Sequence, residues 1–123
     1  MLVSIGSGVS MIKVTNSGSF ERVSGTMIGG GTLVGLSNLL TGINDFDEII
    51  ELSSKGDNSG VDMLVKDIYG DKTPFKELQG DWLASSFARV ANDHTTTGAE
   101  IQKKYKKEDM LHSLMYMISF NIG

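Results

Sequence analysis

The sequence predicts a mixed α/β fold in which a β-hairpin unit comes first and helices follow. Two glycine-rich segments, 4–10 and 24–32, enclose β-rich runs, whereas most of the remaining chain has apolar residues at helical spacing. The composition is ordinary for a globular protein, with 40% hydrophobic and 21% charged residues. At 123 residues, the chain corresponds to one domain or to part of one.

The β-rich runs 11–15 and 20–24 flank a short glycine-containing loop. Two such runs joined in this way are typical of a β-hairpin. A hairpin returns its second strand beside its first, so we expect Arg22 to lie near the loop that holds Ser7 and Ser10. Serine hydroxyls donate and accept hydrogen bonds, and a planar guanidinium suits a carboxylate or a phosphate. By spacing alone, turn serines and a solvated strand arginine are the simpler explanation.

The two glycine-rich segments are candidate anion-binding loops. Glycine lets backbone N–H groups approach an anion closely. The segment 24–32 leads into a helical pattern at Leu33, which adds unpaired N–H groups and the positive end of the helix dipole. For either segment alone, a tight turn is the favoured explanation. The pair, joined by a hairpin, favours a site for phosphates or a small polar anion.

Helical patterns follow the hairpin unit. Thr32 is expected to cap the first helix and Gly42 to end it. The apolar positions of this helix are Leu36, Leu39, Leu40 and Ile43. The second helix begins with the acidic turn 45–48 and ends at Lys55, with a glycine just beyond.

A third helix is predicted after the next turn, where Ser59 and Asp62 resemble a capping box. Asp57, Asp62 and Asp67 invite a metal-binding or acid–base interpretation. Structural roles explain all three carboxylates more simply: Asp57 in a turn, Asp62 in a first helical turn and Asp67 on the flank of a helix. The chain has no cysteine and its two histidines are isolated, so no metal site is predicted.

The pattern is irregular from 71 to 107. This segment holds the only proline, and we expect Trp82 to be a packing anchor rather than a base-stacking platform. The polar run 92–98 is expected to be a loop, and the lysines around Tyr105 a solvated lead-in to a helix. The final helix has one apolar face, formed by Met110, Leu111, Leu114, Met115 and Ile118.

Charge and composition exclude several classes of function. The net charge of −4 and the pI near 5.0 disfavour a nucleic-acid-binding surface. No apolar run approaches membrane-spanning length, and the absence of cysteine excludes a disulfide framework. We therefore expect a soluble, cytoplasmic protein with neither nucleic acid nor membrane as its partner.

Several motifs occur together in an order and at a spacing that resemble the eukaryotic-type (type II) pantothenate kinases. The matching segments are 2–10, 20–26, 29–32, 35–36, 39–42, 56–59, 61–65, 67–70, 84–87 and 121–123. They cover most of the chain outside 71–106, and together they are far more specific than a lone glycine motif. The chain departs from the pattern at Asp71 and Ala88, where the family usually has glycine. A positive φ at Ala88 would require the local backbone to adjust.

The resemblance implies a fold and a place within it. The fold is the actin-like, ribonuclease H-like fold of acetate and sugar kinases, in which ATP and substrate meet between two lobes. Residues 1–123 would be a partial second lobe of the kinase domain. It would comprise a glycine-rich β unit at 1–32, helices at 33–70, an irregular part at 71–107 and a C-terminal helix at 108–123.

The resemblance also implies ATP-dependent phosphorylation of pantothenate to 4'-phosphopantothenate, the first step of coenzyme A biosynthesis. Ser7, Ser10 and Arg22 would bind pantothenate or an inhibitory acyl-coenzyme A such as acetyl-coenzyme A. Arg22 would be catalytic as well, by stabilising charge near the transferred group. The phosphate side of the nucleotide site would be lined by Gly6, Gly8, Gly29, Gly30, Gly31 and Thr32. Mg²⁺ is expected, with ligands outside this chain, and the full-length protein is expected to be a homodimer.

No residue matches the family's carboxylate base or its Asp-Gly-Gly-Thr type phosphate loop. The apolar start at Leu2 and the end after a helical pattern lead us to expect an internal piece of a longer kinase or a shortened relative. Two hypotheses follow. The chain carries part of a genuine kinase site, or it is a non-catalytic relative that binds pantothenate, an acyl-coenzyme A or a partner subunit.

Overall fold

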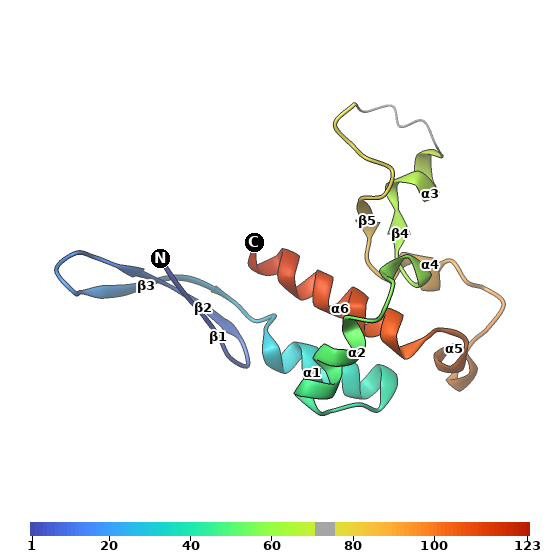
Figure 1. Cartoon of the computed structure of the whole chain (residues 1–123), viewed down its shortest axis with the longest axis horizontal. Coiled ribbons are helices and arrows are strands. Elements are labelled where there is room, and N and C mark those ends of the chain that lie inside the picture. The colour runs from blue at the N-terminus through green and yellow to red at the C-terminus, as the bar shows by residue number, and fades with distance from the viewer. Residues whose placement is uncertain (71–75) are drawn as a thin grey trace.

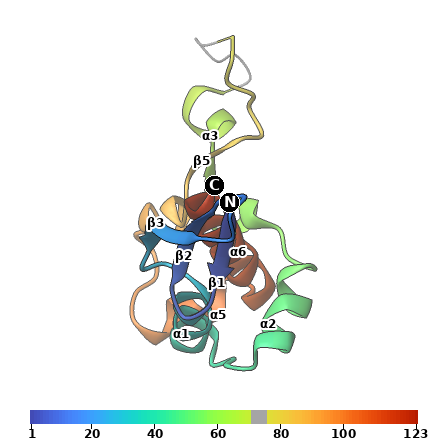
Figure 2. The ribbon, with the colours of Figure 1, turned by 90° about the vertical axis from the view of Figure 1, so that its left-hand side faces the viewer.

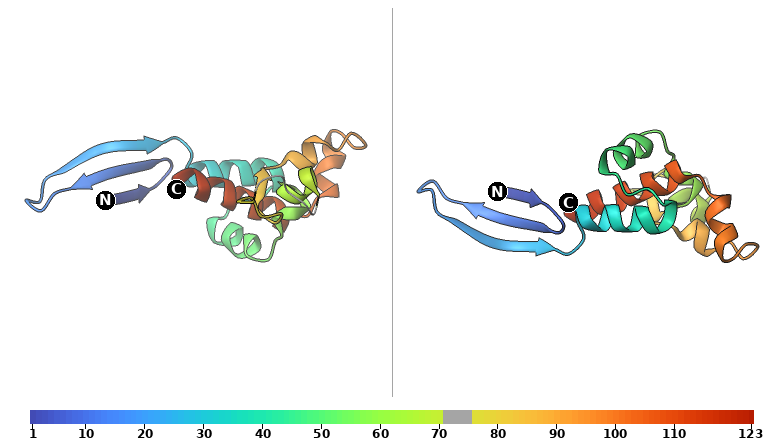
Figure 3. Two further views of the ribbon diagram at one scale, coloured as in Figure 1. Left: turned by 90° about the horizontal axis from the view of Figure 1, so that it is seen from above. Right: turned by 90° about the horizontal axis from the view of Figure 1, so that it is seen from below.

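The computed structural model describes residues 1–70 and 76–123. It is an α/β structure in which a three-stranded sheet precedes a helical body (Figure 1). The sheet extends away from one end of that body in both views of Figure 3. Asp71, where the family usually has glycine, and Pro74, the only proline of the sequence, lie outside the described residues.

The predicted hairpin is confirmed, and a further strand pairs with it. Strands β1 (Leu2–Ile5), β2 (Val9–Val14) and β3 (Phe20–Thr26) form an antiparallel sheet in the order β1-β2-β3. Ser10 in β2 lies opposite both Ser4 and Gly25. An irregularity at Met11 and Ile12 shifts the register, so that Ile12 lies opposite Arg22.

The sheet contributes little to the core. Val9 is its one buried hydrophobic side chain within the described residues, whereas Phe20 is 77% exposed. The core lies in the helical body, where α1 (Gly30–Thr41), α2 (Phe46–Ser53) and α6 (Lys107–Ile122) pack together. Its buried residues are Leu33, Ile49, Leu111, Leu114 and Ile118.

The predicted helical faces are largely confirmed. The apolar positions of α6 are buried or half-buried, and Leu36, Leu40 and Ile43 pack against the core. Leu39 is the exception, because it is 75% exposed. The caps agree in part: Asp45 accepts the N–H of Asp47 at the start of α2, and Gly42 ends α1 with a φ of 78°.

The third helix is much shorter than the sequence predicts. The short 3₁₀ helix η1 (Asn58–Gly60) and strand β4 (Met63–Leu64) come first, and α3 spans only Val65–Tyr69. The expected capping box is wrong, since Asp62 lies before α3 and is fully buried. Asp67 acts at this helix start instead, accepting the N–H of Leu64 at 2.8 Å.

The segment after residue 75 contains more regular structure than the sequence predicts. Strand β5 (Leu83–Ser85) pairs with β4, and α4 (Ala88–Ala91) and α5 (Ala99–Lys104) follow. Figure 2 shows β5 and α3 rising from the helical body. Ala88 is helical and needs no positive φ, because the left-handed residue is its neighbour Phe87. Within the described residues, no helix has the length and apolarity needed to cross a membrane.

The polar loop 92–98 is anchored by Asp93, whose side chain is only 7% exposed. One carboxylate oxygen accepts the N–H and hydroxyl of Thr95, and the other accepts Lys104 Nζ at 2.5 Å and the Tyr105 hydroxyl at 2.7 Å. These bonds, above all that from Lys104, hold the pKa of Asp93 well below its usual range. The hydroxyl bond to the carboxylate raises the pKa of Tyr105.

Asp93→Asn is expected to lower the free energy of unfolding at neutral pH, because Lys104 loses its charged partner when the carboxylate is replaced by an amide. A carboxylate with a depressed folded pKa stabilises the protein above its unfolded pKa of 3.8, and that stabilisation is lost as the pH falls further. The stability difference between wild type and variant should therefore shrink as the pH falls below 3.8. Urea unfolding between pH 2 and 7, with exposed Glu77→Gln as control, measures it. A pH-independent difference would contradict the assignment.

Candidate functional site: the glycine loops and Arg22

The two glycine-rich segments contact each other directly. The turn between β1 and β2 meets the start of α1, where the N–H of Gly30 donates to the carbonyl of Gly6 at 2.9 Å. The N–H of Gly31 donates to the carbonyl of Ser7 at 3.1 Å. The turn carbonyls therefore satisfy two of the N–H groups that a helix start leaves without an intrahelical partner.

Close backbone approach explains why glycines occupy this contact. A Cβ at Gly29 would lie 2.8 Å from the Cα of Gly8 and from the carbonyl oxygen of Ser7. A Cβ at Gly30 would lie 2.8 Å from the carbonyl oxygen of Gly6. Neither contact leaves space for a side chain, so the glycines are required by packing between the loops.

Thr32 lies in the first turn of α1, and its side chain bonds to the backbone of the second glycine-rich loop. The helix begins at Gly30 with Gly29 as its N-cap residue, so the prediction that Thr32 is the cap is wrong. Its hydroxyl accepts the N–H of Gly29 at 3.1 Å and donates to the carbonyl of Met27 at 3.3 Å. The expectation of unpaired N–H groups at this helix start is also wrong for Gly29, Gly30 and Gly31.

The structure brings Arg22 and Ser10 together, as the hairpin predicted. Arg22 Nε donates to Ser10 Oγ at 3.3 Å. Gly25 makes space for the guanidinium, because a Cβ there would collide with it and would lie 2.6 Å from the carbonyl oxygen of Val9. Ser7 lies in the adjacent turn, and its side chain is exposed.

Arg22 is exposed and carries a charge without a carboxylate partner in the described part of the chain. The ion pairs there are Lys55–Glu51, Arg89–Asp67, Lys103–Glu100 and Lys104–Asp93. A guanidinium has five N–H donors, and the bond to Ser10 uses one of them. The other donors of Arg22 can therefore bind an anion at the surface of the sheet.

A contact that the sequence did not predict joins the sheet to the end of α6. Asn121 Nδ2 donates to Thr26 Oγ1 at 2.9 Å, and the same hydroxyl accepts the N–H of Ile28 at 3.2 Å. Asn121 lies in a motif of the family resemblance, but nothing local in the sequence indicates a partner 95 residues away.

The other acidic candidates are occupied by structural bonds. The hydroxyl and N–H of Ser59 lower the pKa of Asp57, and the N–H of Leu64, with Arg89 as a further cause, lowers that of Asp67. Asp57 also caps η1. Within residues 1–70 and 76–123, no three or more His, Asp or Glu side chains gather to hold a metal ion.

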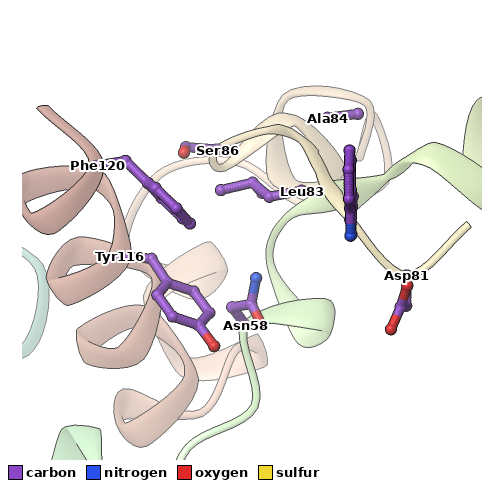
Figure 4. Close-up of a pocket in the computed structure, with 8 residues that line it drawn as sticks. Asn58, Asp81, Leu83, Ala84, Ser86, Tyr116 and Phe120 are labelled. Carbon is purple, nitrogen blue, oxygen red and sulfur yellow. The ribbon is translucent and has the colours of Figure 1, made fainter. Parts of the chain in front are cut away.

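A cavity of about 660 Å³ lies in another part of the helical body (Figure 4). Its lining consists of Asn58, Asp81, Trp82, Leu83, Ala84, Ser86, Tyr116 and Phe120. Trp82 is 47% exposed and lines this cavity together with two aromatic residues of α6. The sequence predicts a packing anchor for Trp82; in the structure this side chain is half-exposed, and the two aromatic residues that line the same cavity come from a helix distant in the sequence.

Comparison with known proteins assigns the family. The Fumble family model matches residues 1–123, so the chain belongs to the Fumble family. It is 51% identical over its whole length to pantothenate kinase 2 and pantothenate kinase 1 of Arabidopsis thaliana, covering 13% and 31% of those proteins. It is 47% identical to pantothenate kinase of Schizosaccharomyces pombe, covering 30% of it. The chain thus spans less than a third of the length of these relatives.

One relative has a different kind of name. The chain is 46% identical, over all of its length, to 4'-phosphopantetheine phosphatase of Mus musculus, and it covers 14% of that protein. The likeness in this region is therefore shared by proteins named for a kinase and by one named for a phosphatase.

Gly29→Ala is expected to destabilise the chain by about 1–3 kcal/mol, because its Cβ would press on the backbone of the first loop. Gly35→Ala is the matched control: it lies within α1 with no atom near its Cβ position, and should stabilise by about 0.5–1 kcal/mol through helix propensity. Urea unfolding of both variants measures the difference. Equal effects of one sign would show that the two loops do not pack closely in solution.

Proposed function

We propose that this chain forms part of a pantothenate kinase, which phosphorylates pantothenate to 4'-phosphopantothenate with ATP in the first step of coenzyme A biosynthesis. The observation that carries the proposal is the exposed guanidinium of Arg22, held beside Ser10 by the hairpin and without a carboxylate partner in the described residues. Membership of the Fumble family and about 50% identity to proteins named pantothenate kinase support the choice of reaction.

Arg22 would act on the anionic groups of the substrate. Pantothenate carries a carboxylate, and a guanidinium fork can bind a carboxylate through two parallel N–H bonds. Ser10 orients the fork through Nε, and Ser7 offers a hydroxyl from the adjacent turn. Arg22 would also stabilise charge that develops near the transferred phosphoryl group. The same residues would bind the inhibitory acyl-coenzyme A, which shares the pantothenate moiety.

The glycine loops would contribute to the phosphate side of the site indirectly. The N–H groups of Gly29, Gly30 and Gly31 already have partners within the chain. Their contribution to phosphate binding, with that of Gly6, Gly8 and Thr32, would come from the positive end of the α1 dipole. The loops would also set the distance between α1 and the strand that carries Ser10.

Other parts of the reaction would depend on residues outside this chain. The described residues do not hold a carboxylate cluster suited to Mg²⁺, so its ligands would come from outside this chain. No residue matches the family's base. We also propose a homodimeric, cytoplasmic full-length protein, by analogy with the family.

The second candidate is a non-catalytic relative that binds pantothenate, an acyl-coenzyme A or a partner subunit through the same surface. The mouse relative named as a phosphatase supports this second candidate, because a similar region occurs in a protein that is not named as a kinase. Binding of pantothenate without phosphoryl transfer in the full-length context would support it.

Arg22→Ala, in a full-length kinase that contains this chain, is expected to reduce kcat/KM for pantothenate by an order of magnitude or more. A charge-assisted contact is worth about 1.5–3 kcal/mol, whereas an exposed strand arginine should change stability by no more than about 0.5 kcal/mol. Arg22→Lys should restore little activity, because lysine lacks the planar fork. Steady-state kinetics together with urea unfolding separates the two effects. Unchanged kinetics in both folded variants would remove Arg22 from the site.

The 123-residue chain alone is not expected to phosphorylate pantothenate at a useful rate. Loss of a general base costs about 10²–10⁴-fold, and loss of phosphate positioning adds to that. ADP release by the pure chain with ATP and pantothenate tests this, and the full-length protein is the positive control. Pantothenate-dependent turnover by the chain would contradict the assignment of the base to another part of the protein.

A further inference from the structure

Asp62 is a fully buried carboxylate that the proposed kinase site does not use. Its Oδ1 accepts the N–H of Phe87 at 2.7 Å and the hydroxyl of Ser113 at 2.5 Å. Its Oδ2 accepts Asn58 Nδ2 at 3.0 Å. The three donors come from η1, from the turn between β5 and α4, and from α6. One side chain therefore joins three segments that are distant in the sequence.

The bond to Phe87 holds an unfavourable backbone conformation. Phe87 has a φ of 59° and a ψ of 7°, and it is the only described residue other than glycine with a positive φ. A residue with a Cβ is strained in this left-handed region and stays there only where its surroundings impose it. The N–H that Asp62 accepts belongs to this strained residue, so the carboxylate stabilises the turn at its least favourable point.

The same three segments contribute to the walls of the cavity in Figure 4, together with residues 81–84. Asn58 contributes its own side chain, and Ser86 lies directly before the strained turn. On α6, Ser113 lies one helical turn before Tyr116, which lines the cavity. The wall that contains Leu83 lies in β5, which pairs with β4, and β4 begins directly after Asp62.

We propose that Asp62 is the positioning residue of this aromatic cavity, which sets the separation of its walls by binding all three segments at once. The proposal does not depend on the kinase function or on Arg22. Removal of the carboxylate would leave three donors without their acceptor and would release the left-handed turn. The cavity should then change shape while the core of α1, α2 and α6 stays folded.

Trp82 reports on the cavity, since it is the only tryptophan of the chain and lines this space. In the folded 123-residue chain, Asp62→Ala is expected to change the acrylamide quenching of Trp82 fluorescence. It should also speed hydrogen exchange of the Phe87 amide at least about tenfold beyond any change at the Leu114 amide in the core. Asp62→Asn keeps an oxygen for Phe87 and Ser113 but turns an NH₂ group towards Asn58. It should alter Trp82 quenching and leave Phe87 protected.

Asp45→Ala is the matched control, because it removes a carboxylate that caps α2 away from the cavity. It should change the exchange of Phe87 and Leu114 by the same factor and leave Trp82 quenching unchanged. The same pattern in Asp62→Ala would overturn the proposal, since Asp62 would then contribute only global stability. If Asp62→Ala does not fold, Asp62→Asn decides: unchanged Trp82 quenching in that variant would equally overturn it.

Discussion

The backbone contact between the turn at Gly6–Gly8 and the first turn of α1 determines how the sheet joins the helical body. Two N–H groups of the helix and two carbonyls of the turn satisfy one another, so neither set needs water or a ligand. The two backbones approach so closely here that a Cβ at Gly29 or Gly30 would lie 2.8 Å from atoms of the turn, so these positions require glycine. The position of Ser10 and Arg22 relative to α1 depends on this contact, because β2 begins directly after the turn.

Two different kinds of interaction hold the remainder of the described chain. The apolar faces of α1, α2 and α6 form the core, and their burial is the main stabilising contribution. The segments after α2 rely on carboxylates, since Asp62, Asp67 and Asp93 each join parts of the chain that are distant in sequence. The helical core is therefore stabilised mainly by hydrophobic burial, which has no preferred direction. The arrangement of the cavity and of the loop 92–98 depends instead on specific hydrogen-bond geometry.

The sequence predicted the features that depend on neighbouring residues. Local patterns predict the hairpin, the end of α1 at Gly42, the acidic start of α2 and the apolar face of α6, and the structure confirms these features. The proximity of Arg22 to Ser10 was predictable as well, because a hairpin brings together residues about twelve positions apart by its topology alone. The third helix was predicted wrongly, since Asp62 sits at a spacing that also suits a capping box.

The sequence by itself therefore determined the hairpin, the approximate positions of α1, α2 and α6, the apolar face of α6, and that a glycine-rich pair of loops precedes the first long helix. Only the tertiary structure decided that these glycines serve contact between the loops, that Asp62 is an interior hydrogen-bond centre, and that Trp82 shares a cavity with Tyr116 and Phe120. The physical reason is the distance along the sequence over which each interaction acts. Propensity, capping and periodicity act over a few residues, whereas a close backbone approach or a buried carboxylate is defined by partners that meet only after the chain has folded.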